Sequence, residues 1–139
     1  MFSPSYAHPQ PHWVELAGQR YEVELALNDT TRAQGLMFRP ALEKHHGMLF
    51  IHQRQGPLAY WMKNCLIPLD ILFFDEQKHL VGQQRGLPPC ADGDACPPYA
   101  SQSPARFVLE VNAGEADRLH LHAGMTLKLD PSIPVLDIR

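Results

Sequence analysis

Three polar side chains interrupt the most apolar stretch of this chain, residues 60–74. Lys63, Asn64 and Asp70 lie there among aromatic and branched residues. A polar group taken out of water needs a partner, because leaving it unpaired costs about 1 to 3 kcal/mol. The stretch is therefore either a part of the core in which polar side chains pair with one another and connect strands, or the bottom of a binding or catalytic site.

A second polar set lies on the clearest strand of the sequence, residues 106–112. On a two-residue period Phe107, Leu109 and Val111 share one face, and Arg106, Glu110 and Asn112 share the other. We expect this set to meet the polar residues of stretch 60–74 across the folded chain.

These groups predict a pocket that binds a small ligand. Trp61 offers an aromatic platform, while polar groups at its side would orient a small polar or carbohydrate-like molecule. The residues expected to line the pocket are Arg39, Trp61, Lys63, Asn64, Asp70, Arg106, Glu110 and Asn112. No catalytic residue, metal ligand or cofactor is assigned.

Two alternatives belong to other classes of protein. A hydrolase could use Asp70 or Glu110 with Lys63 or a metal, and Asp70 and Glu110 could also serve as a pair in general acid/base chemistry. The sequence contains no phosphate-binding glycine loop, no Gly-x-Ser-x-Gly and no His-Glu-x-x-His, which disfavours an enzyme. The second alternative is a protein-interaction module that displays an aromatic surface.

The three cysteines leave two states open. Cys90 and Cys96 could close a small disulfide ring worth about 2 kcal/mol in an oxidising compartment, and in the cytosol they would be thiols. Their spacing is not that of a zinc or redox Cys-x-x-Cys motif. Cys65 is expected to be a small buried apolar residue.

Composition limits the partners. The 139 residues include 13 prolines, 45% are apolar and the formal net charge is −3. This charge gives no basic surface for nucleic acid. No apolar run reaches the roughly 18 residues needed to span a membrane, and no export signal is recognisable. We therefore expect a cytoplasmic monomer, or an extracytoplasmic protein if a signal was removed.

The fold expected from these patterns is mainly β, at the border with α+β. It is a compact antiparallel β-sandwich or barrel-like domain with two or three short helices. We divide the chain into a flexible leader (1–12), one β-rich domain (13–130) and a tail (131–139). Strands are predicted at 13–16, 20–27, 48–51, 59–63, 67–74, 80–84, 106–112 and 125–129. Residues 53–57 and 86–104 are predicted to be loops.

Helices are predicted in three short segments. The side chains of residues 28–31 can cap a helix that Gly35 would end. Residues 41–46 could form one further turn. Asn112 is expected to cap a helix at 113–119.

Four motifs in one order resemble the family called domain of unknown function 192. They are Gly35-Leu36-Met37-Phe38-Arg39, Gly47-Met48-Leu49-Phe50, Trp61-Met62-Lys63-Asn64 with Ile67-Pro68-Leu69-Asp70-Ile71, and the run from Ala105 to Gly114. The resemblance implies a compact antiparallel β-sandwich with short helices and no established activity.

The resemblance also bears on the cysteines. Family members often carry paired cysteines in the loop that here holds Cys90 and Cys96, and many carry an export or lipoprotein signal, which suits a disulfide. Cys65 departs from the family pattern, because a threonine is common at that place.

Overall fold

The computed structural model of this protein describes residues 11–135. Most of the predicted leader (1–12) and the end of the predicted tail (131–139) lie outside the described residues. The first strand begins at His12, the last residue of the predicted leader. Among residues 11–135 no helix is long and apolar enough to cross a membrane.

The elements are nine strands, two short α-helices and one 3-10 turn within the described residues. The strands are β1 (His12–Leu16), β2 (Gln19–Ala26), β3 (His46–Gly56), β4 (Ala59–Trp61), β5 (Leu69–Phe74), β6 (Leu80–Leu87), β7 (Pro98–Ala100), β8 (Ala105–Asn112) and β9 (Lys128–Leu129). The helices are α1 (Asp29–Gln34) and α2 (Glu115–Arg118), and the 3-10 turn is η1 (Gly93–Ala95). The predicted mainly β class is confirmed.

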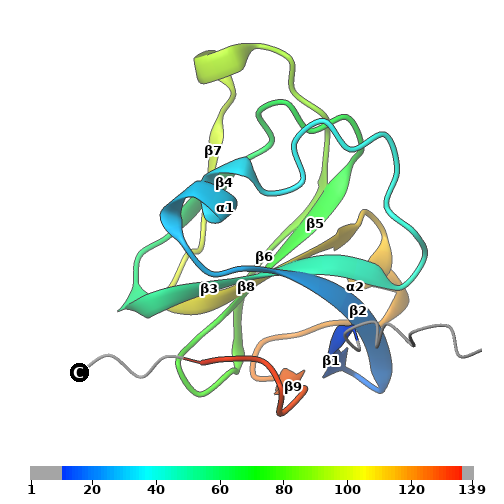
Figure 1. Ribbon diagram of the computed structural model, residues 1–139, viewed down its shortest axis with the longest axis vertical. Helices are drawn as coiled ribbons and strands as arrows, with labels where there is room; N and C mark the ends of the chain where they lie inside the picture. The colour runs from blue at the N-terminus through cyan, green and yellow to red at the C-terminus, as the bar shows by residue number, and fades with distance from the viewer. Residues whose placement is uncertain (1–10, 136–139) are drawn as a thin grey trace, which may run out of the picture.

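Seven strands form one curled sheet in the order β6-β5-β8-β3-β2-β1-β9, and β4 pairs with β7 in a small second sheet. Figure 1 shows α1, β4 and β7 together on one side of the curled sheet. The predicted all-antiparallel pairing is wrong at one place, because β2 and β3 run parallel. The connection through α1 and residues 35–45 is long enough to return the chain in the same direction.

Helix α1 begins and ends where its local sequence predicts. The side chain of Asn28 accepts a hydrogen bond from the backbone N–H of Thr31, and the Thr31 hydroxyl closes a capping box. Gly35 follows with a φ of 48°, a conformation that costs least at glycine. This short helix positions Arg32 and Gly35 at the site described below.

Both faces of the sheet are buried at β5 and β8. Leu72, Phe74, Leu109 and Val111 belong to a first core, packed against β1 and β2. The residues of β5 and β8 that point to the opposite face of the sheet belong to a second core, which lies under β4, β7 and α1. All six residues of β5 are buried, which explains why this strand reads as nearly continuous apolar sequence.

Several element boundaries differ from the sequence prediction. Strand β3 continues to Gly56, through the loop predicted at 53–57, and the predicted helical turn at 41–46 is not helical. The predicted loop 86–104 contains the end of β6, the turn η1 and strand β7. Helix α2 is shorter than predicted and starts after Gly114.

Candidate functional site

A pocket of about 230 Å³ opens between α1, β3 and β4. Its lining residues come from segments that are far apart in the sequence but meet over the second core. They are Arg32, Ala33, Gln34, Gly35, Leu36, Met37, Phe50, His52, Ala59, Tyr60, Trp61, Lys63, Cys65 and Glu110. Three of the eight residues predicted from the sequence, Trp61, Lys63 and Glu110, are among them.

Glu110 is the buried acid of this pocket. It lies on β8, only 4% of its surface is exposed, and no hydrogen bond or ion pair holds its side chain within residues 11–135. Burial raises the pKa of the Glu110 carboxyl to about 8, because removal from water disfavours the charged form. At pH 7 this carboxyl is therefore mostly protonated.

His52 and Tyr60 form an uncharged pair in the same pocket as Glu110. The His52 Nε2 lies 2.7 Å from the Tyr60 hydroxyl oxygen, and Phe50 packs edge-on against the Tyr60 ring at 5.1 Å between centroids. Burial, followed by the nearby Arg32 cation, lowers the pKa of His52 to about 4. Burial likewise raises the pKa of Tyr60, so both side chains are neutral around pH 7.

The two cations that line the pocket already have anionic partners. The Arg32 guanidinium donates to Asp29 and to the Ile51 carbonyl, each at 2.8 Å. The Lys63 ammonium donates to Asp94 at 2.5 Å and lies 4.9 Å from the centroid of the Trp61 ring.

A disulfide between Cys90 and Cys96 closes the loop that supplies Asp94. The loop is tied to the turn that follows β4, because the Asn64 N–H donates to the Cys90 carbonyl at 3.0 Å. The third cysteine, Cys65, is free and buried and lines the pocket. Burial and the neighbouring Glu110 raise its pKa to about 11, which disfavours a thiolate nucleophile.

Asp70 lies on the other face of the sheet and does not meet Glu110. In the β5–β8 ladder Asp70 pairs with Val111 and Ile71 pairs with Glu110, so the two carboxyl groups are offset by one residue. An offset of one residue turns a side chain to the opposite face. The predicted meeting of these two acids, and the acid–base pair that they would form, are therefore wrong.

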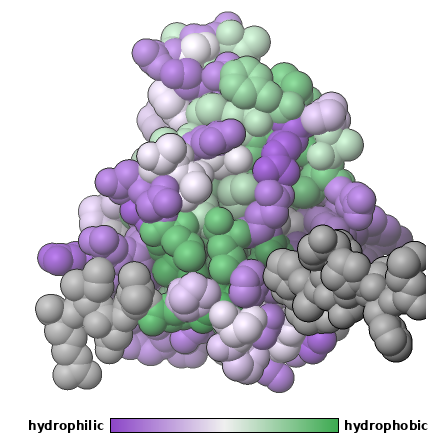
Figure 2. Space-filling model, in the orientation of Figure 1, coloured by the Kyte–Doolittle hydropathy of each residue, from purple (hydrophilic) through white to green (hydrophobic). Residues whose placement is uncertain are grey.

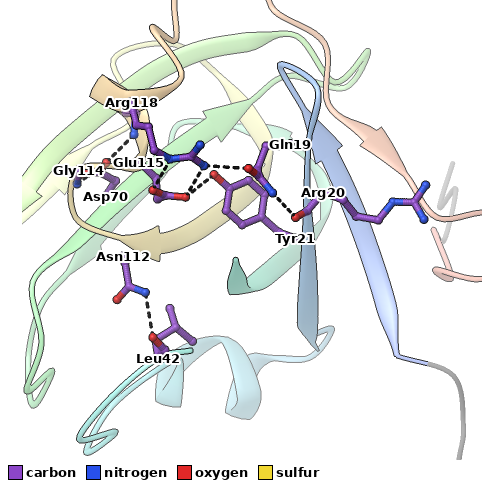
Figure 3. A network of polar contacts seen from close by, with 10 residues as sticks. Gln19, Arg20, Tyr21, Leu42, Asp70, Asn112, Gly114, Glu115 and Arg118 are labelled. Atoms are coloured by element: carbon purple, nitrogen blue, oxygen red, sulfur yellow. Dashed lines mark hydrogen bonds and ion pairs between the residues drawn. The ribbon is translucent and has the colours of Figure 1, made fainter. Parts of the chain in front are cut away.

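The carboxylate of Asp70 is saturated by backbone donors. It accepts hydrogen bonds from the N–H groups of Gly86 at 2.8 Å, Gly114 at 3.1 Å and Ala116 at 2.9 Å. Figure 3 shows Asp70 beside Gly114, next to the network of Tyr21, Glu115 and Arg118. Asp70 is thus the side-chain acceptor at the start of α2.

The other predicted site residues lie outside the pocket. Asn112 was expected to cap α2, but its amide donates instead to the Leu42 carbonyl at 2.9 Å (Figure 3). Arg39 pairs with Glu24 at the surface at 2.7 Å. Asn64 contacts the Met37 sulfur at 3.9 Å, and Arg106 donates to the His52 carbonyl at 3.0 Å.

Sequence reasoning missed five polar groups of the pocket. They lie on a short helix, two strands and a turn that the sequence does not bring together, and they are Arg32, Gln34, His52, Tyr60 and Cys65. The alternation of residues 48–52 would have placed His52 on the Phe50 face, so part of the signal was present. Within residues 11–135 no group of three His, Cys, Asp or Glu could hold a metal ion.

Exposed apolar side chains lie close to the pocket in the sequence. Phe38 is 64% exposed and Leu66 is 54% exposed, and the Phe38 N–H donates to the Asn64 carbonyl at 2.7 Å. Figure 2 shows apolar residues at the upper end of this face and again in its lower centre, among hydrophilic side chains.

Solved structures of similar proteins share this fold. One, from Sinorhizobium meliloti 1021, is described as a "putative transcription regulator"; it is 33% identical, with a TM-score of 0.78 over 86% of this chain and 94% of that chain. Another, of unknown function from Novosphingobium aromaticivorans DSM 12444, is 29% identical, with a TM-score of 0.76 over 92% of this chain and 91% of that chain.

A comparison with curated proteins gives no match. The family model of domain of unknown function 192 (DUF192), described as an uncharacterised ACR family, matches residues 12–129. This match covers most of the 139 residues and includes all four motifs that first suggested the family. The chain therefore belongs to the DUF192 family.

Proposed function

We propose that this protein is a binding domain for a small polar ligand, and that its site is the pocket lined by Glu110. The observation that carries the proposal is a carboxyl that is 4% exposed, lines a cavity of about 230 Å³ and has no hydrogen-bond partner in residues 11–135. Buried polar groups are normally paired, and a carboxyl in a cleft with a strongly raised pKa is a candidate functional group. Within residues 11–135 no completely buried side-chain oxygen or nitrogen lacks a partner, so the Glu110 oxygens remain accessible from the pocket.

A bound ligand would supply the partner that the protein does not. The apolar part of the lining, including Leu36, Met37 and Phe50, would contact the body of the ligand, while Glu110 and the His52–Tyr60 pair would fix its polar group. Trp61 and Lys63, which were predicted from the sequence, lie at the same pocket and support the proposal.

A fragment screen tests this proposal with one blocking variant. Ala59 is exposed on β4 and lines the pocket, so Ala59→Trp would fill the cavity without a change in the core. Ala123→Trp makes the same change at an exposed turn that does not line the pocket. Ligand-observed NMR and thermal shift would be measured for small polar fragments against all three proteins.

We expect fragments that bind the native protein and Ala123→Trp but not Ala59→Trp. Binding that survives Ala59→Trp would move the site elsewhere. A library that binds none of the three proteins would overturn the proposal.

The structure bears differently on the hydrolase and on the protein-interaction module. The pairing of Asp70 with Glu110 is lost, because the oxygens of Asp70 are bonded to backbone N–H groups on the opposite face of the sheet. A hydrolase that uses Glu110 with Lys63 stays a prediction, since both residues line the pocket. The protein-interaction module stays a prediction, and exposed Phe38 and Leu66 are where such a partner would contact the chain. The formal charge of −3 does not favour extending the description of the Sinorhizobium protein to DNA binding here.

A further inference from the structure

We propose that the ligand of this pocket carries an organic ammonium group, such as that of a primary amine, and that this group pairs with the carboxylate of Glu110. This inference rests on the proposed function, because it names the chemical class that the same pocket would accept.

The charge arrangement is the first argument. The cations of the lining are already compensated within the described structure, Arg32 by Asp29 and Lys63 by Asp94. Glu110 is the carboxyl group of the lining, and its side chain has no hydrogen-bond or ion-pair partner in residues 11–135. An anionic ligand would face this carboxyl and two occupied cations, whereas an ammonium ion would give the carboxylate the counter-charge that burial demands.

The aromatic lining is the second argument. Phe50, Tyr60 and Trp61 all line the cavity, and aromatic rings attract cations through the negative charge on their faces. The Lys63 ammonium at 4.9 Å from the Trp61 ring centroid shows that one such contact already exists at this pocket. A neutral sugar or alcohol would gain less from this combination of a carboxylate and aromatic rings.

The titration of the pocket gives a signature. Of the other groups that line it, His52 has a pKa near 4, Cys65 has one near 11, and burial raises the pKa of Tyr60. Glu110 is thus the group that changes charge between pH 6 and 8.

An ammonium ligand must displace the proton of Glu110 below pH 8. With a pKa near 8, apparent affinity should rise roughly 50-fold between pH 6 and pH 8 and then level off. Each binding event at pH 6 should release close to one proton. A neutral ligand that needs the protonated carboxyl would show the opposite trend.

Three four-carbon probes separate the ligand classes. The compounds n-butylamine, n-butanol and n-butanoate share one chain and differ in the charge of the head group. Titrations by NMR at pH 6 and 8, with calorimetry in two buffers of different ionisation enthalpy, would give affinity and proton release. The variants are Glu110→Gln, and Glu22→Gln as a control at an exposed acid on β2 that does not line the pocket.

We expect n-butylamine to bind best, with proton release and a rise in affinity from pH 6 to 8. Glu110→Gln should remove both effects, and Glu22→Gln should keep them. Equal or tighter binding of n-butanol or n-butanoate would overturn the amine inference and leave the pocket proposal intact. If none of the three probes binds but other fragments bind and are blocked by Ala59→Trp, the amine inference is overturned and the pocket proposal stands. If no fragment binds at all, both proposals are overturned.

Discussion

Replacing Glu110 by glutamine should change how the stability of the unliganded protein depends on pH. Burial raises the pKa of this carboxyl from 4.5 to about 8 in the folded chain. Between these values the folded protein keeps a proton that the unfolded chain has released. The native protein therefore loses stability as pH rises through this window, and the loss is complete above pH 8.

The size of the effect follows from the difference between the two pKa values. One unit corresponds to about 1.4 kcal/mol, so the full difference of about 3.5 units amounts to at most about 5 kcal/mol between pH 4 and pH 9. Glutamine is nearly the same shape and does not titrate. The free energy of unfolding of Glu110→Gln minus that of the native protein should therefore grow more positive with pH, by up to about 1.4 kcal/mol per unit.

The assay is urea unfolding at pH 5, 6, 7, 8 and 9, followed by the fluorescence of Trp13 and Trp61. Any free energy that the amide of the Glu110→Gln variant itself costs is the same at every pH, and the titration of groups common to both proteins cancels in the difference between them. The readout is therefore the slope, against pH, of the difference in the free energy of unfolding. A difference that stays constant from pH 5 to 9 would refute the account of Glu110 as a buried acid without a partner.

Three further predictions concern groups outside the pocket. Asp70→Asn should cost roughly 3 kcal/mol in urea unfolding, because three backbone N–H groups lose a charged acceptor; a cost below about 1 kcal/mol would contradict that role. Arg39→Ala should cost no more than about 1 kcal/mol in the same assay, since its pair with Glu24 is exposed, and a larger loss would mean that Arg39 does more than form this pair. The double variant Cys90→Ser with Cys96→Ser should lower the free energy of unfolding by about 2 kcal/mol, and an unchanged melting temperature in calorimetry would argue against the disulfide.

Local patterns explain what the sequence could predict. The ends of α1 are set by residues within one turn, through the capping side chain of Asn28 and the positive φ of Gly35. The two faces of β8 follow from alternation alone, with Leu109 on one face and Glu110 on the other. The strand content and the family followed from the same kind of evidence.

Non-local pairing explains what the sequence could not predict. The parallel alignment of β2 with β3 depends on the path of residues 35–45, which carry no regular pattern. His52 and Tyr60 meet only because β4 leaves the main sheet and pairs with β7 above it. The pocket is assembled from these two events, so its residues could be named only in part.

The same limit explains why two buried acids on neighbouring strands looked alike and behave differently. Asp70 lies where the turn into α2 presents the N–H groups of Gly114 and Ala116, and these donors hold it as a structural carboxylate. Glu110 lies one position along β8 from the ladder partner of Asp70, so its side chain points to the opposite face of the sheet. There it faces the aromatic side chains and sulfur of the second core, and no donor in residues 11–135 reaches it. Sequence can identify an acid in an apolar strand, but only the supply of nearby donors decides whether that acid stabilises the fold or is available to a ligand.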